Sequence, residues 1–313
     1  MNIPSLNLAD FLSGSANRKQ SFVKQLGKAF EEIGFVAVKN HGVPDKLIVD
    51  LYTQTQQFFS LPAIEKKKYE DLALAGQRGY TSFGKEHAKG SDSPDLKEFY
   101  QYGQVTSYSL NKEEYPPNVS VKELVGFNET FETAYKAFEQ SGMVLLQAIS
   151  LYLELEEHYF DKYIKNGNSI LRAIHYPPIT EEPKSALRAE QHEDINLITL
   201  LVGASADGLQ VLTKQNNWIA VTSSSDEIVV NVGDMLQRFT NNRLKSTTHR
   251  VVNPPEDLWH TSRFSLPFFL HPVSSMSLAC LESCVSIQNP SLYQDYTAGE
   301  YLNERLREIG LKK

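Results

Sequence analysis

The second half of this chain consists of short apolar segments separated by turn residues. Seven such segments follow Ser169, at residues 170–175, 195–202, 209–212, 218–220, 228–232, 246–252 and 263–270. Each is three to eight residues long, which is the length of a typical β-strand. Several short strands at this spacing predict a β-sandwich or a barrel.

The rest of the chain is predicted to be mainly helical. Apolar residues recur at helical spacing over 17–33, 45–60, 121–155 and, at the end of the chain, 299–309. Gly34 ends the first helix, and residues 35–38 then form a short buried strand. Residues 76–94 are rich in glycine, serine and charged residues, which predicts a loop.

This pattern predicts the α+β class, with helices packed outside a β core. The 313 residues exceed the commonest domain size, yet one barrel-like domain with attached helices can be this long. We therefore expect a single compact unit, 1–313. Its parts are an N-terminal region (1–120), a long connecting helix (121–160), the β core (165–275) and a C-terminal segment with a helix (276–313).

Charge and composition restrict the partners that we expect. The formal charge is -7 and there is no basic tract, which argues against nucleic acid or an anionic membrane as a partner. No apolar run is long enough to span a membrane, and the N-terminus lacks the features of a secretory signal. Cys280 and Cys284 are too few for a disulfide framework. We expect a cytoplasmic protein whose partner is a small molecule; a monomer is favoured, and the oligomeric state is left open.

Two histidines and an aspartate predict a metal site. His192 and Asp194 lie two residues apart, and His249 follows within the segment 246–252. Alternate residues of a strand face the same way, so His192 and Asp194 can approach one ion. Two imidazoles and one carboxylate form the facial triad of non-haem iron(II) enzymes, which leaves positions on the metal open.

Arg263 and Ser265 predict an anion site beside this metal. They share one face of the segment 263–270, whereas Phe264, Leu266 and Phe268 occupy the other face. A buried arginine is costly unless an anion satisfies it, and its planar fork suits a carboxylate. The alternative is an internal salt bridge to a buried aspartate or glutamate.

These motifs, in this order, resemble the isopenicillin-N-synthase-like family of iron(II)/2-oxoglutarate-dependent dioxygenases. The resemblance covers nearly the full chain. Other matching stretches are Gly34-Phe35, Asn40-His41-Gly42-Val43, Tyr176-Pro177-Pro178, Asp207-Gly208-Leu209-Gln210-Val211, Asn231-Val232-Gly233-Asp234 and Ser246-Thr247-Thr248-His249-Arg250-Val251.

The resemblance implies a distorted double-stranded β-helix, or jelly roll, with helices outside. It implies that His192, Asp194 and His249 bind Fe(II), with 2-oxoglutarate and O2 as cosubstrates. Arg263, Ser265 and Tyr176 would then bind the distal carboxylate of 2-oxoglutarate. Plant members of this family typically carry asparagine two residues before the tyrosine, where this chain has Ile174.

The residues leave several functions open. The favoured one is an oxygenase that couples decarboxylation of 2-oxoglutarate to hydroxylation or desaturation of a small molecule. A related oxidase could use the same arginine to hold the carboxylate of its own substrate, without 2-oxoglutarate. Zinc accepts the same three ligands, so a hydrolase is a further alternative, as is a non-catalytic jelly-roll binding module.

Two further motifs need an interpretation. Residues 79–86 resemble a phosphate-binding loop, but Glu86 replaces the hydroxyl residue that would hold magnesium and no apolar strand precedes it. We instead expect a loop in which Tyr80 and Phe83 contact the substrate above the iron; the alternative is that they only pack within the loop. The segment 76–94 and the C-terminal helix are expected to border the mouth of the pocket. His175 is expected to face away from the metal, because its neighbour Tyr176 faces the pocket.

Overall fold

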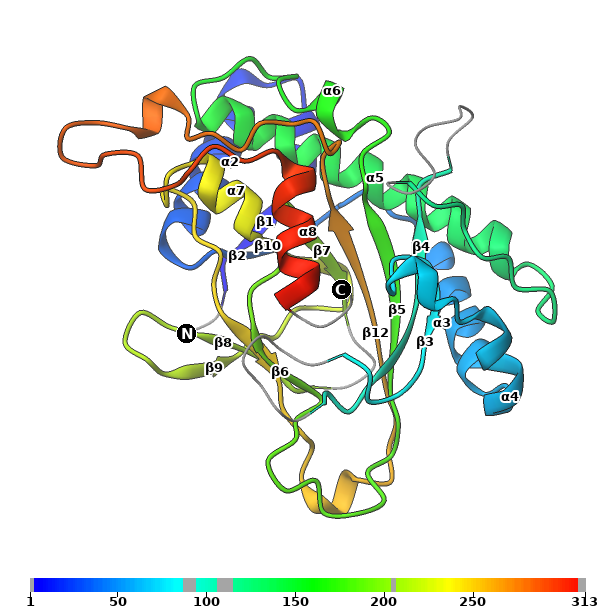
Figure 1. Cartoon of the computed structure of the whole chain (residues 1–313). Coiled ribbons are helices and arrows are strands. Elements are labelled where there is room, and N and C mark those ends of the chain that lie inside the picture. Colours follow the sequence, from blue (N-terminus) through cyan, green and yellow to red (C-terminus); the bar gives the residue numbers. More distant parts are fainter. Residues whose placement is uncertain (1–2, 87–93, 106–114, 204–206, 309–313) are drawn as a thin grey trace.

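Two β-sheets form the centre of the molecule (Figure 1). The structure is a computed structural model, and it describes residues 3–86, 94–105, 115–203 and 207–308. The larger sheet has eight strands in the order β1 (Ser5–Asn7), β2 (Phe35–Lys39), β10 (Glu227–Val232), β7 (Ile198–Val202), β12 (Arg263–Leu270), β5 (Ile170–Tyr176), β4 (Glu98–Gly103) and β3 (Gly79–Thr81).

The smaller sheet has four strands in the order β6 (Ala189–His192), β11 (His249–Val251), β8 (Leu209–Leu212) and β9 (Trp218–Ala220). The described pairs in both sheets are antiparallel, apart from β1 and β2, which are parallel. Together they form the predicted distorted jelly roll, with helices outside it.

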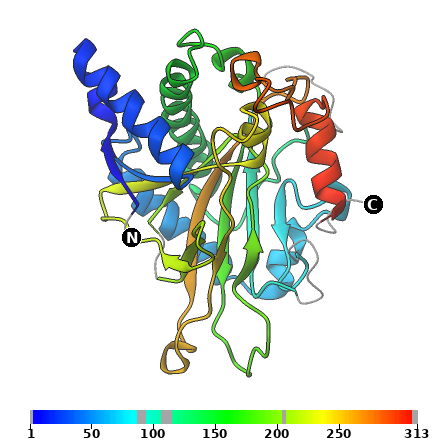
Figure 2. The ribbon, with the colours of Figure 1, turned by 90° about the vertical axis from the view of Figure 1, so that its left-hand side faces the viewer.

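The helices are α1 (Leu8–Leu12), α2 (Ala16–Glu32), α3 (Asp45–Phe59), α4 (Ala63–Lys66), α5 (Phe127–Tyr152), α6 (Asp161–Ile164), α7 (Asp234–Phe239) and α8 (Ala298–Glu308). Short 3-10 turns lie at Lys67–Tyr69, Leu72–Leu74, Glu256–Leu258 and Glu282–Cys284. Figures 1 and 2 show α2 and α5 on one side of the strands and α8 on the other. Among the described residues, no helix is both long and apolar enough to cross a membrane.

The long helix α5 covers the outer face of the larger sheet. Its Tyr135 and Phe138 rings lie 5.1 and 5.7 Å from the ring of Phe268 on β12. Strand residues alternate between the two faces, so the neighbours of Phe268 point away from α5. The even-numbered residues of β12 therefore build the core with the helices, and the odd-numbered residues line the interior of the jelly roll.

The chain turns sharply between α2 and β2 at Gly34, as predicted. Gly34 has a φ of +77°, and a Cβ there would lie 2.2 Å from the carbonyl oxygen of Lys245. Only glycine combines this backbone conformation with so close an approach. The turn places β2 at once beside β10, within the larger sheet.

Several predicted boundaries were wrong. The helix predicted over 121–155 begins at Phe127, because Gly126 before it has a φ of +82°. Strands β1, β3, β4 and β6 were missed, and β3 lies inside the predicted loop 76–94, of which residues 87–93 lie outside the described part. Three-residue strands such as β1 and β3 carry too few residues to show an alternating pattern.

Candidate metal centre

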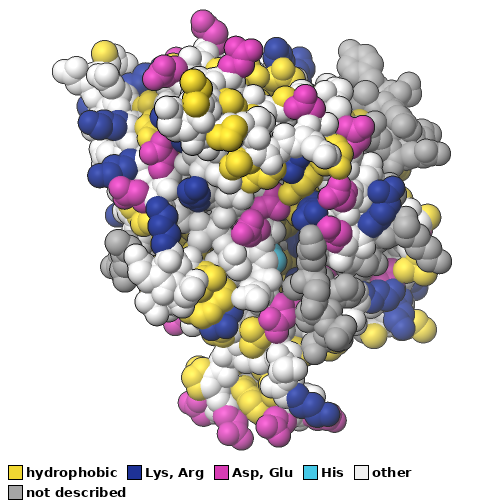
Figure 3. Space-filling model, turned by 60° about the vertical axis from the view of Figure 1, so that its left-hand side comes forward, with side chains coloured by type: hydrophobic (Ala, Val, Ile, Leu, Met, Phe, Trp, Pro, Cys, Tyr) yellow, Lys and Arg dark blue, Asp and Glu magenta, His cyan; other side chains and the backbone are white. Residues whose placement is uncertain are grey.

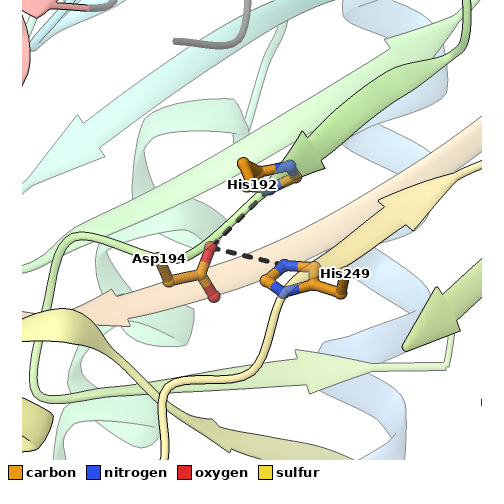
Figure 4. A group of neighbouring side chains, drawn as sticks. All are labelled: His192, Asp194 and His249. Atoms are coloured by element: carbon orange, nitrogen blue, oxygen red, sulfur yellow. Dashed lines mark ion pairs between the residues drawn. The ribbon is translucent and has the colours of Figure 1, made fainter. Parts of the chain in front are cut away.

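Three side chains from separate segments converge inside the jelly roll (Figure 4). His192 ends β6, Asp194 lies in the loop that follows, and His249 begins β11. One ligand atom from each residue lies within 4.8 Å of those from the other two. The sequence prediction that Asp194 shares a strand with His192 was wrong: the two histidines are instead paired across β6 and β11, and the loop supplies the carboxylate.

Backbone carbonyl groups orient both imidazoles. Nδ1 of His192 lies 2.6 Å from the carbonyl oxygen of Glu190, and Nδ1 of His249 lies 3.1 Å from that of Thr247. A carbonyl only accepts, so Nδ1 carries a proton in each ring, and in the neutral form of the ring Nε2 has the lone pair that can bind a metal. Both Nε2 atoms face Asp194 Oδ1, at 3.9 Å for His192 and 3.6 Å for His249.

The carboxylate of Asp194 is held through its other oxygen. Oδ2 accepts hydrogen bonds from the hydroxyl of Thr199 at 2.6 Å and from Nδ2 of Asn231 at 2.8 Å. Thr199 and Asn231 are paired residues on β7 and β10, so the rigid sheet fixes the carboxylate. Oδ1 is left to face the two imidazoles. Such outer hydrogen bonds are typical of metal ligands, because they orient the ligand atom.

The loop that carries Asp194 is fastened to the start of α7. The backbone nitrogen of Asp234 donates to the carbonyl of Asp194 at 2.8 Å. At Gly233, an added Cβ would lie 2.1 Å from Oδ1 of Asn196. The stretch 231–234 therefore supports the site in two ways, since Asn231 holds the carboxylate and Gly233 lets the loop come close.

The charge states of Asp194 and His192 suit a divalent metal, whereas His249, whose pKa is raised, must lose a proton when it binds one. Burial alone would raise the pKa of Asp194, but His249, His192 and Asn231 outweigh it and hold that pKa well below its usual range. Burial and the neighbouring His249 lower the pKa of His192 to about 4. Burial would lower the pKa of His249, yet Asp194 raises it above its ordinary value. A ligand set with one ionised carboxylate results, and it fits iron(II) with open positions.

The predicted anion residues lie together at one end of the same interior. Arg263 and Tyr176 are paired across β12 and β5, and the guanidinium carbon of Arg263 lies 5.0 Å from the tyrosine ring centre. Arg263 is 1% exposed, and its Nε donates to the carbonyl of Asp207 at 3.2 Å. Ser265 lies on the same face, opposite Ile174. The structure therefore brings together Arg263, Ser265 and Tyr176, as the sequence predicted.

One cavity of about 590 Å³ joins the triad to this anion end. Its lining includes the three triad residues as well as Arg263, Ser265 and Tyr176. Figure 3 shows this face of the molecule hollowed, with histidine visible at the bottom of the hollow. Leu302, Arg305, Leu306 and Glu308 of α8 also line the cavity. The prediction that the C-terminal helix borders the pocket was correct.

Tyr80 and Phe83, for which we expected substrate contacts, lie away from the cavity. Tyr80 is buried on the helix side of the sheet, where its hydroxyl donates to Glu98, and Phe83 is 49% exposed. His175 faces the same helix side as Tyr80, as predicted, with Nδ1 2.8 Å from Glu98. Strand alternation explains the positions of Tyr80 and His175, because β3 and β5 turn these residues away from the interior.

Sequence reasoning missed a group of charged residues on the cavity wall. Glu86, Asp95, Lys97 and Arg172 line the cavity and are connected by ion pairs; we call them the cavity cluster. The signal for Arg172 was present, since it lies four residues before Tyr176 on one strand and therefore shares its face. Asp95 and Lys97 directly precede β4, a strand that the apolar pattern did not reveal, and Glu86 lies in the predicted loop 76–94.

Two family models match the chain. The first, described as "non-haem dioxygenase in morphine synthesis N-terminal", matches residues 3–123. The second, described as "2OG-Fe(II) oxygenase superfamily", matches residues 167–272. The second range contains all three triad residues and Arg263, Ser265 and Tyr176.

Curated relatives match over the whole length of the chain. Proline hydroxylase buaE of Petromyces alliaceus is 32% identical, over 98% of this chain and 99% of its own. The 2-oxoglutarate-dependent dioxygenase htyE of Aspergillus rugulosus is also 32% identical, over 96% of this chain and 97% of its own.

Solved structures also match over nearly the whole length of the chain. A 2OG-Fe(II) oxygenase family protein from Caulobacter crescentus superposes with a TM-score of 0.88 at 38% identity, over 98% of this chain and 99% of that one. A full-length protein of Neurospora crassa, in complex with alpha-KG and thymine, superposes with a TM-score of 0.87 at 28% identity, over 97% and 96% of the two chains.

Proposed function

We propose which residues hold the iron and the cosubstrate in this chain, which belongs to the 2OG-Fe(II) oxygenase superfamily. His192, Asp194 and His249 hold the iron, and Arg263 binds the distal carboxylate of 2-oxoglutarate. The enzyme couples decarboxylation of 2-oxoglutarate to oxidation of a small molecule. Iron(II), when bound, supplies the activation of dioxygen that no side chain can perform. The residues described below bind, orient and exclude water.

The observation that carries this assignment is the orientation of the three ligand atoms. Both Nε2 atoms and Asp194 Oδ1 face one point. The remaining polar atoms of these side chains form hydrogen bonds with Glu190, Thr247, Thr199 and Asn231. A group of side chains that merely stabilised the fold would not need to keep all three inward atoms available. This arrangement supports a facial iron site with protein ligands on one side.

The residues at the anion end of the cavity support a binding position for 2-oxoglutarate there. Arg263 is buried and lies within the cavity that reaches the triad, with Tyr176 beside it and Ser265 two residues on. We propose that the guanidinium and the Ser265 and Tyr176 hydroxyl groups bind the distal carboxylate of 2-oxoglutarate. The other end of the oxo acid then reaches the metal. Ile174 and Val251 add apolar lining to this cavity and pack with Phe99.

The relatives indicate which substrates to test first. One is named a proline hydroxylase, and another is crystallised with thymine. Both molecules are small and polar, and a cavity of about 590 Å³ that must also hold 2-oxoglutarate suits such a size. We propose hydroxylation of a small polar metabolite as the reaction.

The metal assignment is tested with His249→Ala. Wild-type protein, loaded anaerobically, should bind about one iron(II) per chain and release succinate when 2-oxoglutarate and oxygen are added. His249→Ala should lose both properties while it keeps its circular dichroism spectrum. His158→Ala is the matched control, because that histidine is on the surface, with 69% of its side chain exposed. Full iron occupancy of a folded His249→Ala protein would refute the assignment.

The cosubstrate assignment is tested with Arg263→Ala. Its KM for 2-oxoglutarate should rise about tenfold to a hundredfold, because a charge-assisted contact is lost. Arg263→Lys should recover only part of this loss, since lysine offers no planar fork. Product formation at an undiminished rate without 2-oxoglutarate would instead show that Arg263 holds the carboxylate of the substrate itself.

We also propose that the enzyme works in the cytoplasm. Cys280 and Cys284 are both free in the structure, and the chain has no other cysteine. Free thiols and a ferrous ion suit a reducing compartment. Localisation of a tagged full-length chain by microscopy tests this proposal.

A further inference from the structure

The cavity cluster forms a wall of fixed charges on the β4–β5 side of the cavity. Lys97 Nζ lies 2.8 Å from Glu86 and 2.7 Å from Asp95, and Arg172 Nη1 lies 3.2 Å from each carboxylate oxygen of Glu86. These side chains are only 4–14% exposed. Two cations and two anions are thus buried together, and their formal charges cancel.

The guanidinium of Arg172 is held rigidly in this wall. Its Nε donates to Oε1 of Gln101 at 2.8 Å, and its carbon lies 4.2 Å from the ring centre of Phe99 and 5.2 Å from that of Phe269. Gln101 is itself fixed, because its amide donates to the carbonyl of Gly76. A planar cation stacked on aromatic rings and held along its edge is preorganised to bind a carboxylate.

Arg172 in this wall lies apart from the residues assigned to 2-oxoglutarate, whereas Lys97 lies near Tyr176. Across the larger sheet, Arg172 stands on β5, four residues from Tyr176, and Gln101 is its partner on β4. Arg263 and Ser265 lie on β12, on the other side of β5. The cavity therefore has a cation on the β5 wall that is separate from Arg263, and the cosubstrate assigned to Arg263 leaves Arg172 for another ligand.

Buried charge at this position is costly for the fold. Replacing a buried ion pair by apolar residues of similar volume is often neutral or stabilising, so stability alone does not explain the cluster. Charged groups gathered in a cleft beside a metal site are instead typical of ligand recognition. Apolar residues of the same lining include Ile170, Phe269, Leu302 and Leu306.

We propose that the cavity cluster binds the charged end of a zwitterionic substrate, a free amino acid with an aliphatic or cyclic side chain. The carboxylate binds Arg172, the ammonium group binds Glu86, and the hydrocarbon part contacts the apolar lining. A zwitterion leaves the charge balance of the wall unchanged, whereas a net charge would be buried without compensation. This inference rests on the proposed function, because it assumes that 2-oxoglutarate occupies the Arg263 end.

The test measures equilibrium binding without turnover. Protein loaded with iron(II) and 2-oxoglutarate under nitrogen is titrated calorimetrically with each standard L-amino acid, with its amide and N-acetyl forms, and with thymine as a neutral imide. At least one aliphatic or cyclic amino acid should bind. Its amide, which lacks the carboxylate, and its N-acetyl form, which lacks the ammonium group, should each bind at least tenfold more weakly.

The chain offers a closely matched pair of variants. Arg250 lies on β11 outside the cavity lining, its Nε donates to Gln210 at 3.0 Å, and its guanidinium carbon lies 4.0 Å from the ring centre of Trp218. These contacts mirror those of Arg172 with Gln101 and Phe99. Arg172→Gln should weaken amino-acid binding at least tenfold, Arg172→Lys should recover part of it, and Arg250→Gln should bind as wild type.

Failure of this inference can be told from failure of the proposed function. Succinate release without added substrate measures the slow uncoupled turnover of 2-oxoglutarate. If wild-type protein shows neither iron binding nor this turnover, the proposed function itself fails. If it shows both, then binding of thymine but no amino acid, or equal binding by Arg172→Gln and Arg250→Gln, overturns the zwitterion proposal. Glu86→Gln serves as a second variant where Arg172→Gln does not fold.

Discussion

Two buried ion clusters lie on opposite faces of the larger sheet. One is formed around Glu98, the first residue of β4, and the other includes Lys97, which directly precedes it. Glu98 faces the helices, where it accepts from Lys66 at 2.8 Å, from His175 at 2.8 Å and from the hydroxyl of Tyr80; we call these four residues the sealed cluster. Lys97, one residue earlier, faces the interior and belongs to the cavity cluster. Alternation along one strand separates the two.

The difference between them lies in what surrounds the charges. The sealed cluster is enclosed by protein: Phe59 packs on His175 at 5.3 Å, and no member of the cluster lines the cavity. The cavity cluster has all its members in the cavity lining. Similar ion pairs therefore serve different ends. Breaking the first cluster is expected to change stability alone, and breaking the second is expected to change ligand binding and the metal site as well.

The largest expected effect is that of Glu98→Ala on stability. The change leaves Lys66 buried without its carboxylate partner, which typically costs about 3–5 kcal/mol of unfolding free energy. Urea denaturation measures this loss, and uncoupled 2-oxoglutarate turnover per folded molecule should stay at the wild-type level. The control is Glu132→Ala, which removes an exposed pair with Lys136 and should cost less than about 1 kcal/mol. Equal losses in the two variants would contradict the comparison.

The second-largest effect is expected for Asp95→Ala, which tests whether the cavity cluster is connected to the metal site. Asp95 Oδ1 accepts from the backbone nitrogen of Glu190 at 2.9 Å, and the carbonyl of Glu190 orients His192. Loss of such an outer contact typically lowers metal affinity about tenfold to a hundredfold. Asp95→Asn keeps an acceptor and should stay within a few-fold of wild type. Iron affinity is read from anaerobic competition with a chelator. Wild-type affinity in Asp95→Ala would show that the wall and the metal site are independent.

A smaller effect is expected for Tyr80→Phe. The variant loses one hydrogen bond to the Glu98 carboxylate, which should cost about 1–2 kcal/mol of unfolding free energy. The KM for the substrate should not change, because Tyr80 lies on the sealed side. Phe83→Ala, at an exposed position, should change stability by less than about 0.5 kcal/mol. A changed substrate preference in Tyr80→Phe would restore the prediction made from the sequence.

The smallest effect is a pH dependence of the cavity cluster. Burial would raise the pKa of Glu86, but Arg172 and Lys97 outweigh it and lower that pKa from 4.5 to about 2. The ionised form therefore adds stability that is complete above pH 4.5 and is lost as the pH falls towards 2. Between pH 6 and pH 4 the loss should be about 1 kcal/mol, and Glu86→Gln should lack this component. Urea titrations at both pH values measure the unfolding free energy. An equal change of this free energy with pH in wild type and in Glu86→Gln would contradict the shifted pKa.

Short motifs made much of the site predictable. His192, Asp194, His249, Arg263 and Ser265 were proposed from residue type and spacing, because a facial triad and a carboxylate fork need these groups. The strands β8, β9 and β12 were predicted with their observed bounds, since each forms a distinct apolar run. The long helices were found through their apolar stripes.

The sequence by itself determined the ligand chemistry, the two-sheet class and the strand face that carries Arg263. These depend on local rules, namely residue type, alternation and helical spacing. Only the tertiary structure decided that Glu86, Asp95, Lys97 and Arg172 meet on one wall, and that Tyr80 does not reach the cavity. Such contacts join residues up to 86 positions apart, as in the pair of Arg172 with Glu86. They follow from strand order and register, which no local pattern of residues specifies.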